Sequence, residues 1–231
     1  MNILVTGGLG YIGSHIICSS VKNLNKFIIL DNLSNSELCT LNKIRKVTGQ
    51  RFKFFHNDLT NKNYIKNLLV EENINVVIHL AGYKSVEESL KNPLKYYNNN
   101  LISTLNLIEA MEETSTRNLV FSSSATVYGD PKYLPIDENH SINPINPYGK
   151  NKANIESLLY DVCYSDPNWS VCCLRYFNPI GAHESGLIGE CNYLNTTNLL
   201  PMINKVITGK EKFLKIFGSN LNTKDGTGIR D

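Results

Sequence analysis

The sequence contains no long hydrophobic run and no strong excess of charge of either sign. No stretch approaches the roughly 20 consecutive apolar residues that a membrane-spanning helix needs. The apolar run in the opening Met-Asn-Ile-Leu-Val-Thr-Gly is too short for the core of a signal peptide. The formal net charge of +2 gives no electrostatic basis for binding nucleic acid or a membrane surface. These absences predict a soluble, cytoplasmic protein.

The sequence also lacks paired metal ligands. No two cysteines form a Cys-x-x-Cys pair, which argues against a zinc site and against a secreted disulfide framework. The histidines likewise have no ligand spacing, so we predict no metal. The adjacent Cys172 and Cys173 lie in an apolar run, and strand alternation would send their side chains to opposite faces of a sheet. The six cysteines are Cys18, Cys39, Cys163, Cys172, Cys173 and Cys191.

What the sequence does contain is a regular alternation of short apolar runs and helix-length segments. Hydrophobic residues make up 42% of the chain, enough for a sizeable core. The alternation predicts an α/β fold with a doubly wound parallel sheet, in which ligands bind beyond the carboxyl ends of the strands. The expected strands are 3–6, 27–30, 53–56, 76–80, 118–122 and 171–175, and the expected helices between them include 11–24, 61–72, 93–113 and 148–164. Within 93–113, the apolar face is predicted to consist of Leu101, Leu105, Ile108 and Met111.

After residue 176 the pattern changes. A loop rich in glycine and asparagine covers 178–198, a helix is expected at 199–208, and the sequence ends in a glycine-rich turn. We therefore divide the chain into a domain of residues 1–176 and a smaller substrate domain, 177–231, that looks incomplete.

A glycine-rich turn follows the first expected strand. Gly7, Gly10 and Gly13 have the spacing Gly-x-x-Gly-x-x-Gly, and with Tyr11 and Ile12 they lead into a helix. Such a turn lets the backbone approach a pyrophosphate at the positive helix N-terminus. Asp31 ends the second strand, where a carboxylate binds the adenosine ribose and would repel a 2′-phosphate. The pattern predicts a Rossmann-type domain that binds NAD.

A second group of residues has the chemistry of proton transfer. The fifth strand ends in Ser122-Ser123-Ser124, and Tyr148 and Lys152 are four residues apart on an expected helix. Residues at this spacing share a helix face. An ammonium beside a phenol stabilises the phenolate, so we expect Lys152 to lower the pKa of Tyr148 toward neutrality. Tyr148 is then a candidate general acid and base, assisted by Ser124.

Seven segments, in this order along the chain, resemble the UDP-glucose 4-epimerase family of the extended short-chain dehydrogenases. They are TGGLGYIGSH, LDNLSNS, VIHLAGYKSVEESLKNPLKYYNNN, FSSSATVYGD, NPYGKNK, LRYFNPIGAH and DGTGIRD. The resemblance implies NAD-dependent interconversion of UDP-glucose and UDP-galactose at sugar C4, and a homodimer formed through helices of 93–113 and 148–164. It also implies a sugar-nucleotide domain that continues for roughly another hundred residues.

The resemblance assigns further binding residues. Positions that contact NAD are, besides the glycine turn, Asp31, Asn32, Asn35, Ser36, Asp58, Leu59, Leu80, Ala81, Gly82, Lys84, Asn99 and Tyr176. Positions that hold the UDP-sugar are Asn178, Asn198, Leu199 and Arg230. The segment 191–197 departs from the sequence that is common in the family, which weakens the expectation for contacts on the uracil side.

Two alternatives stay open. The first is another nucleotide-sugar enzyme of the same superfamily, namely a decarboxylase, a dehydratase or a 4-epimerase of another sugar. Related 4,6-dehydratases carry an acidic pair after the serine-threonine strand end, whereas Ala125 and Thr126 follow Ser124 here. The other alternative is an inactive fragment that binds NAD, because the expected substrate domain is incomplete.

Overall fold

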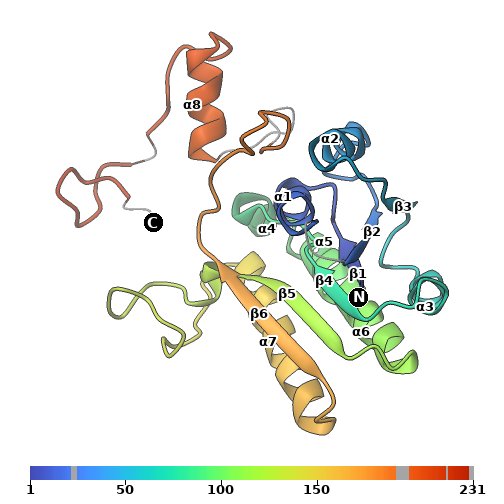
Figure 1. The fold of residues 1–231 in the computed structure, drawn as a ribbon. Coiled ribbons are helices and arrows are strands. Elements are labelled where there is room, and N and C mark those ends of the chain that lie inside the picture. The colour runs from blue at the N-terminus through green and yellow to red at the C-terminus, as the bar shows by residue number, and fades with distance from the viewer. Residues whose placement is uncertain (22–24, 191–197, 217, 229–231) are drawn as a thin grey trace.

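The computed structural model describes residues 1–21, 25–190, 198–216 and 218–228. Its centre is a sheet of six parallel strands in the order β3-β2-β1-β4-β5-β6 (Figure 1). The predicted doubly wound parallel sheet is thereby confirmed, and each predicted strand agrees with the observed one to within two residues. The strands are β1 (Asn2–Thr6), β2 (Lys26–Asp31), β3 (Lys53–His56), β4 (Val76–His79), β5 (Asn118–Ser124) and β6 (Ser170–Tyr176).

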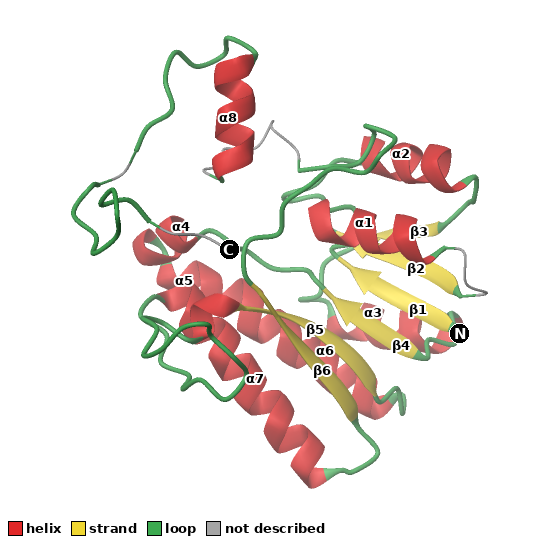
Figure 2. Ribbon diagram, turned by 60° about the vertical axis from the view of Figure 1, so that its left-hand side comes forward, coloured by secondary structure: helices red, strands yellow, loops and turns green. Residues whose placement is uncertain are grey.

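Helices cover both faces of the sheet (Figure 2). Helices α1 (Tyr11–Ser20) and α2 (Cys39–Thr48) pack on one face, and α3 (Lys62–Glu71), α6 (Ser103–Glu113) and α7 (Pro147–Ser165) pack on the other. Neither α2 nor the short α4 (Val86–Lys91) was predicted from the sequence. Helix α4 has six residues, too few for a sustained apolar period, whereas Leu41, Ile44 and Val47 recur every three residues in α2 and would have indicated that helix.

The segment 93–113 was predicted to be one helix, and this is wrong in its first half. It consists of α5 (Pro93–Tyr96), the π-helical turn η1 (Tyr97–Ile102) and then α6. The π-turn closes hydrogen bonds from residue i to i+5 and so accommodates an extra residue. The predicted apolar face also needs correction, because Leu105 is 38% exposed and Leu107 is fully buried in its place.

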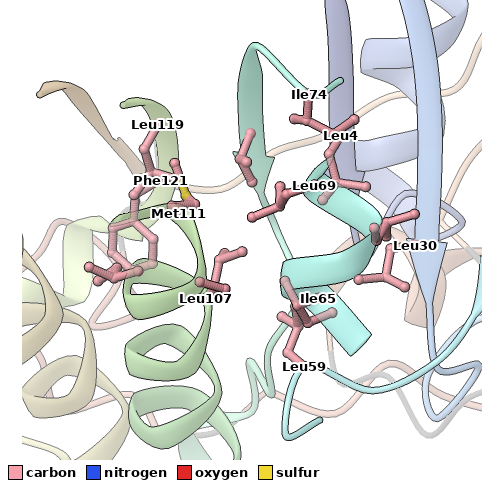
Figure 3. Packing of buried hydrophobic residues seen from close by; sticks show 14 of the residues in the cluster. Leu4, Leu30, Leu59, Ile65, Leu69, Ile74, Leu107, Met111, Leu119 and Phe121 are labelled. Carbon is pink, nitrogen blue, oxygen red and sulfur yellow. The ribbon is translucent and has the colours of Figure 1, made fainter. Parts of the chain in front are cut away.

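The larger core lies between the sheet and helices α3, α6 and α7. Figure 3 shows Leu69 of α3 together with Leu107 and Met111 of α6, near Leu4 of β1 and Phe121 of β5. Each such side chain contributes about 1.5–3 kcal/mol when it is taken out of water. This packing fixes the carboxyl ends of the strands relative to the helices that follow them.

Strands β5 and β6 are less well covered on the opposite face. Cys173 packs against the larger core, whereas Cys172 is exposed and Leu174 is 37% exposed. The alternation predicted for the two cysteines is therefore confirmed. Helices α1 and α2 lie over the other half of the sheet, against β1, β2 and β3 (Figure 1).

The chain beyond β6 contains one helix among its described residues, α8 (Leu199–Ile207), close to the predicted 199–208. Several apolar side chains of this region are exposed, among them Ile207, Phe213 and Ile216. Across the described ranges, none of the helices has the length and apolar character to cross a membrane.

Candidate active site

The glycine turn after β1 is as tight as predicted. Gly7 has a φ of +67°, and a Cβ on it would lie 2.8 Å from the backbone nitrogen of Ala81. A Cβ on Gly13 would lie 2.6 Å from the carbonyl oxygen of Gly7. Gly10 is the N-cap residue of α1 and has no side chain, so the first-turn amides receive no side-chain cap. These features form a cradle that fits a pyrophosphate.

Asp31 connects the end of β2 to this turn. It is 7% exposed, and its Oδ2 accepts a hydrogen bond of 3.0 Å from the backbone N–H of Leu9. Its Oδ1 accepts from the backbone N–H of Leu33 at 3.0 Å and from the Ser36 hydroxyl at 2.7 Å. A carboxylate offers about four acceptor positions, so Oδ2 retains capacity for a ribose hydroxyl.

Asp58 and Asn32 lie next to this carboxylate on the sheet edge. The Asn32 amide donates to Asp58 Oδ2 at 2.6 Å. Burial raises the pKa of Asp58, but hydrogen bonds from Thr60 and Asn32 outweigh it and hold the pKa below its ordinary value. Asp58 is therefore an anion near neutral pH. Asn35, by contrast, is exposed beside this cluster and Leu59 is buried in the core.

His79, which the sequence analysis did not select, fixes the loop after β4. Its Nδ1 lies 2.7 Å from the hydroxyl of Thr6, and its Nε2 lies 2.9 Å from the hydroxyl of Thr104. The Thr104 hydroxyl donates its proton to the carbonyl of Asn100, so it can only accept from His79. The imidazole therefore carries its proton on Nε2 and accepts from Thr6, whose oxygen also receives the N–H of Ala81 at 3.4 Å.

Asn100 in the π-turn holds the same loop from its other side. Its Oδ1 accepts from the backbone N–H of Tyr83 at 2.8 Å, and its Nδ2 donates to the carbonyl of Tyr83 at 3.0 Å. The predicted Asn99 donates to the same Oδ1. A Cβ on Gly82 would lie 3.1 Å from that oxygen. The predicted cofactor segment 80–82 is thus held between the glycine turn and η1.

Ser124, Tyr148 and Lys152 meet at the carboxyl end of β5, as the sequence predicted. Asn146 caps α7 by accepting the N–H of Gly149 at 2.8 Å. The Lys152 ammonium donates to the carbonyl of Ser122 at 2.6 Å and lies 5.9 Å from the centre of the Tyr148 ring. Tyr148 and Ser124 are 9% and 8% exposed. The group is therefore largely shielded from solvent but remains accessible to a ligand at the carboxyl ends of the strands.

The predicted effect of Lys152 on Tyr148 is wrong for the protein alone. Burial raises the pKa of Tyr148, and a hydrogen bond with Ser124 only partly offsets this. Burial likewise lowers the pKa of Lys152 to about 8, opposed by the charge of Glu156. The ammonium points at the Ser122 carbonyl instead of the phenol, so desolvation dominates both groups.

The predicted sugar-nucleotide residues lie beyond β6. Tyr176 ends β6 opposite Ser124 in the register of the sheet, and Asn178 follows it two residues later. Glu190 accepts hydrogen bonds from Lys84, at 3.2 Å, and from the Asn198 amide. Leu199 begins α8 and is 59% exposed. Arg230 and the segment 191–197 lie outside the described residues.

The strand order, the glycine turn and the buried serine, tyrosine and lysine define a Rossmann-type protein of the extended short-chain dehydrogenase class. Residues 4–231 match the family model described as GDP-mannose 4,6 dehydratase. A UDP-glucose 4-epimerase of Dictyostelium discoideum is 48% identical over 229 residues, which are 99% of this chain and 67% of that protein. The chain belongs to the UDP-glucose 4-epimerase family.

Solved structures agree with this assignment. The UDP-glucose 4-epimerase from Bifidobacterium longum, in complex with NAD⁺ and UDP, is 42% identical with a TM-score of 0.97. The enzyme from Stenotrophomonas maltophila, with bound NAD and formylated UDP-arabinopyranose, is 40% identical with a TM-score of 0.96. In both cases the match covers 100% of this chain and 69% of the other chain.

Proposed function

We propose that this chain carries the cofactor-binding and proton-transfer parts of an enzyme that interconverts UDP-glucose and UDP-galactose with NAD. The observation that carries the proposal is the meeting of Ser124, Tyr148 and Lys152 at the sheet edge that also bears the glycine turn. Relatives named UDP-glucose 4-epimerase at 43–48% identity over nearly the whole chain support it. Solved relatives that contain NAD support the choice of cofactor.

In this proposal Tyr148 removes the proton from the sugar 4-hydroxyl and later returns it. The Ser124 hydroxyl, which acts to lower the pKa of Tyr148, would share the proton of the substrate hydroxyl. A bound NAD supplies the hydride acceptor, and its positively charged nicotinamide would favour the phenolate that burial disfavours. Lys152, 5.9 Å from the centre of the Tyr148 ring, adds a positive charge there, because its pKa of about 8 leaves it protonated at neutral pH.

The cofactor would lie along the residues at the carboxyl ends of the strands. The glycine turn at the start of α1 would take the pyrophosphate, and Asp31 would take the adenosine ribose. The segment 80–82 would flank the cofactor on the β4 side, with Lys84 and Asn99 beside it, and Tyr176 would stand at the nicotinamide end. Asn178, Asn198, Leu199 and Arg230 would hold the UDP-sugar through its nucleotide, so that the sugar itself can turn between the two hydride transfers.

A dehydratase is the weaker alternative, although the matching family model has that name. Elimination of water needs an acid beside the reacting carbons. In this chain Ser124 is followed by the short helix η2 (Ala125–Val127), which contains no carboxylate.

The direct test is conversion of UDP-galactose to UDP-glucose without net formation of NADH. We expect Tyr148→Phe to reduce turnover by at least about 100-fold, the scale of lost acid-base catalysis. Tyr160→Phe is the matched control, because Tyr160 lies on the same helix but is 71% exposed. Near-normal turnover of Tyr148→Phe would remove Tyr148 from the mechanism. Retention of NAD without any turnover would instead favour a chain that only binds the cofactor.

A further inference from the structure

A partly buried ion pair, Arg175–Glu156, lies next to the candidate catalytic groups. The Arg175 guanidinium grips the Glu156 carboxylate with Nη2 at 2.8 Å from Oε2 and Nε at 3.1 Å from Oε1. The side chains of Arg175 and Glu156 are only 20% and 8% exposed. Two-point pairing of this kind fixes orientation as well as distance.

The pair extends into a network that joins four parts of the fold. The Ser123 hydroxyl of β5 donates to Glu156 Oε1 on α7. Arg175 on β6 also donates from Nη1 to the Tyr128 hydroxyl at 2.9 Å, and its guanidinium lies 4.9 Å from the centre of that ring. Tyr128 directly follows η2. The network therefore links α7, β5, β6 and the turn after β5.

Three members of the network are neighbours of a candidate catalytic or cofactor residue. Ser123 precedes Ser124, and Arg175 precedes Tyr176. Glu156 follows Lys152 by four residues, one helical turn, on the buried side of α7. A shift of the ion pair would therefore move the backbone that carries these groups.

We propose that Glu156 is a positioning residue, which fixes the end of β5 and supplies the negative charge that keeps the buried ammonium of Lys152 protonated. Lys152 is 6% exposed, and burial without a counter-charge disfavours the protonated form of an ammonium. Around it stand the Ser122 carbonyl and the Phe121 ring of β5, His79 of β4, and Tyr148 and Glu156 of α7.

Of these groups Glu156 supplies the negative charge. His79 has a pKa lowered to about 3 and is neutral, and burial raises the pKa of Tyr148. Burial lowers the pKa of Lys152 to about 8, and Glu156 opposes that effect. Stability alone is a poor measure of this role, because replacing a buried ion pair by neutral groups often leaves stability unchanged. The titration of Lys152 is the specific measure.

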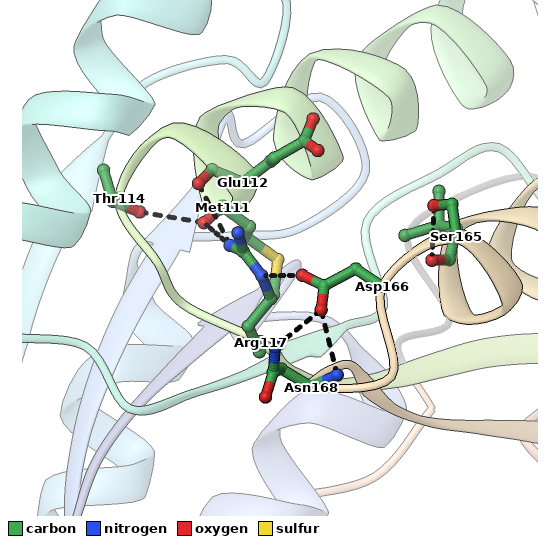
Figure 4. Close-up of polar contacts among 8 residues, drawn as sticks. Met111, Glu112, Thr114, Arg117, Ser165, Asp166 and Asn168 are labelled. Atoms are coloured by element: carbon green, nitrogen blue, oxygen red, sulfur yellow. Dashed lines mark hydrogen bonds and ion pairs between the residues drawn. The ribbon is translucent and has the colours of Figure 1, made fainter.

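The first experiment is an NMR titration of the Lys152 ammonium in the 231-residue chain, using lysine labelled with ¹³C at Cε. We expect Glu156→Gln to lower the apparent pKa of Lys152 by about one pKa unit relative to the unsubstituted chain. The matched control is Asp166→Asn. Asp166 lies at the other end of α7 and pairs with Arg117 Nε at 3.0 Å (Figure 4). Arg117 precedes β5, at the opposite end from Ser124, so this substitution should leave Lys152 unchanged.

A double variant controls for misfolding of the single variant, which would leave the Arg175 charge unpaired. Glu156→Gln leaves Arg175 buried without its carboxylate, so Glu156→Gln with Arg175→Gln removes both charges. The lowered pKa of Lys152 should persist in the double variant. An unchanged Lys152 titration in both variants would overturn the proposal.

The activity arm rests on the proposed function. Since less Lys152 is protonated at a given alkaline pH, the alkaline limb of the turnover profile should move to lower pH in Glu156→Gln and stay in place in Asp166→Asn. An unshifted limb would overturn the catalytic part of the inference. Absence of turnover in the unsubstituted chain, together with a lowered Lys152 pKa in the variant, would reject the proposed function and leave the role of Glu156 standing.

Discussion

His79 is a buried side chain whose protonation state is determined by its hydrogen-bond partners. Thr6, Thr104 and the backbone of Asn100 allow only one arrangement of protons around it, the neutral imidazole with its proton on Nε2. Burial lowers its pKa to about 3, with the charge of Lys152 adding to the effect. This histidine binds the end of β1 to the end of β4 without carrying charge at any pH near neutrality.

That arrangement makes stability depend on pH in a defined window. The unfolded chain takes up a proton on His79 below about pH 6.5, whereas the folded chain does so only below about pH 3. The free energy of unfolding should therefore fall as the pH drops from 6.5 toward 3, with a limit of about 5 kcal/mol from this residue. His79→Asn should flatten the acid branch of urea-unfolding midpoints measured against pH. His56→Asn is the control, because His56 is exposed. An equally steep acid branch in both variants would show that His79 is not responsible.

Sequence reasoning succeeded for residues whose chemistry is visible in local spacing. Tyr148 and Lys152 are four apart on one helix, and Ser124 ends an apolar strand, so pattern alone brought them together. His79 and Asn100 were not predicted, because their roles depend on hydrogen-bond partners that are distant in sequence and adjacent only in the folded chain. Glu156 could have been found from its position one turn after Lys152. The lowered pKa expected for Tyr148 failed because spacing gives proximity but not the direction of the ammonium or the degree of burial.

At the scale of elements, the contact between α7 and η2 leaves no room for a side chain. A Cβ on Gly149 would lie 2.6 Å from the carbonyl oxygen of Thr126 and 3.1 Å from Pro144 Cβ. Glycine at this position therefore lets the N-terminus of α7, and with it Tyr148, approach the end of β5. The strands were predictable because each is a compact apolar run. The π-turn η1 was not, because a change from i+4 to i+5 bonding has no signature in composition.

We expect Gly149→Ala to destabilise the chain by about 1–3 kcal/mol through overpacking and to reduce turnover by separating Tyr148 from Ser124. Gly189→Ala is the matched control, since a Cβ there would meet its nearest neighbour, Ala182 Cβ, at an ordinary 3.4 Å. Urea unfolding and the UDP-galactose assay measure the two effects. Wild-type values for Gly149→Ala in both assays would contradict the close-contact argument.

For the whole molecule, the uneven cover of the sheet is the main feature. The first relatives matched are about half as long again as this chain, which spans 67–69% of their length. The end of the sheet formed by β5 and β6 has Cys172 and Leu174 exposed on one face, whereas the same strands pack against α7 on the other. Parallel strands are normally covered on both faces.

Thiol chemistry can measure that exposure. Cys172 is exposed and should react readily with a disulfide reagent at pH 8. Burial raises the pKa of Cys173 to about 12, so its thiolate is scarce and its access is poor. Cys172→Ser should therefore remove one rapidly reacting thiol and Cys173→Ser should remove none. Equal reactivity of the two thiols would contradict the assignment of faces.

The π-turn has a genetic consequence. Asn98, Asn99 and Asn100 are identical neighbours, so an in-frame loss of any one of their codons yields the same shortened protein. An uninterrupted helix could then form, and the residues before the run would turn by about 100° relative to α6. Because α6 is fixed in the core, the residues before the run, Tyr96 among them, would rotate instead. The ring of Tyr96 packs edge-on against Tyr148 with 6.5 Å between centres. A deletion about fifty residues upstream would thus act at Tyr148 itself.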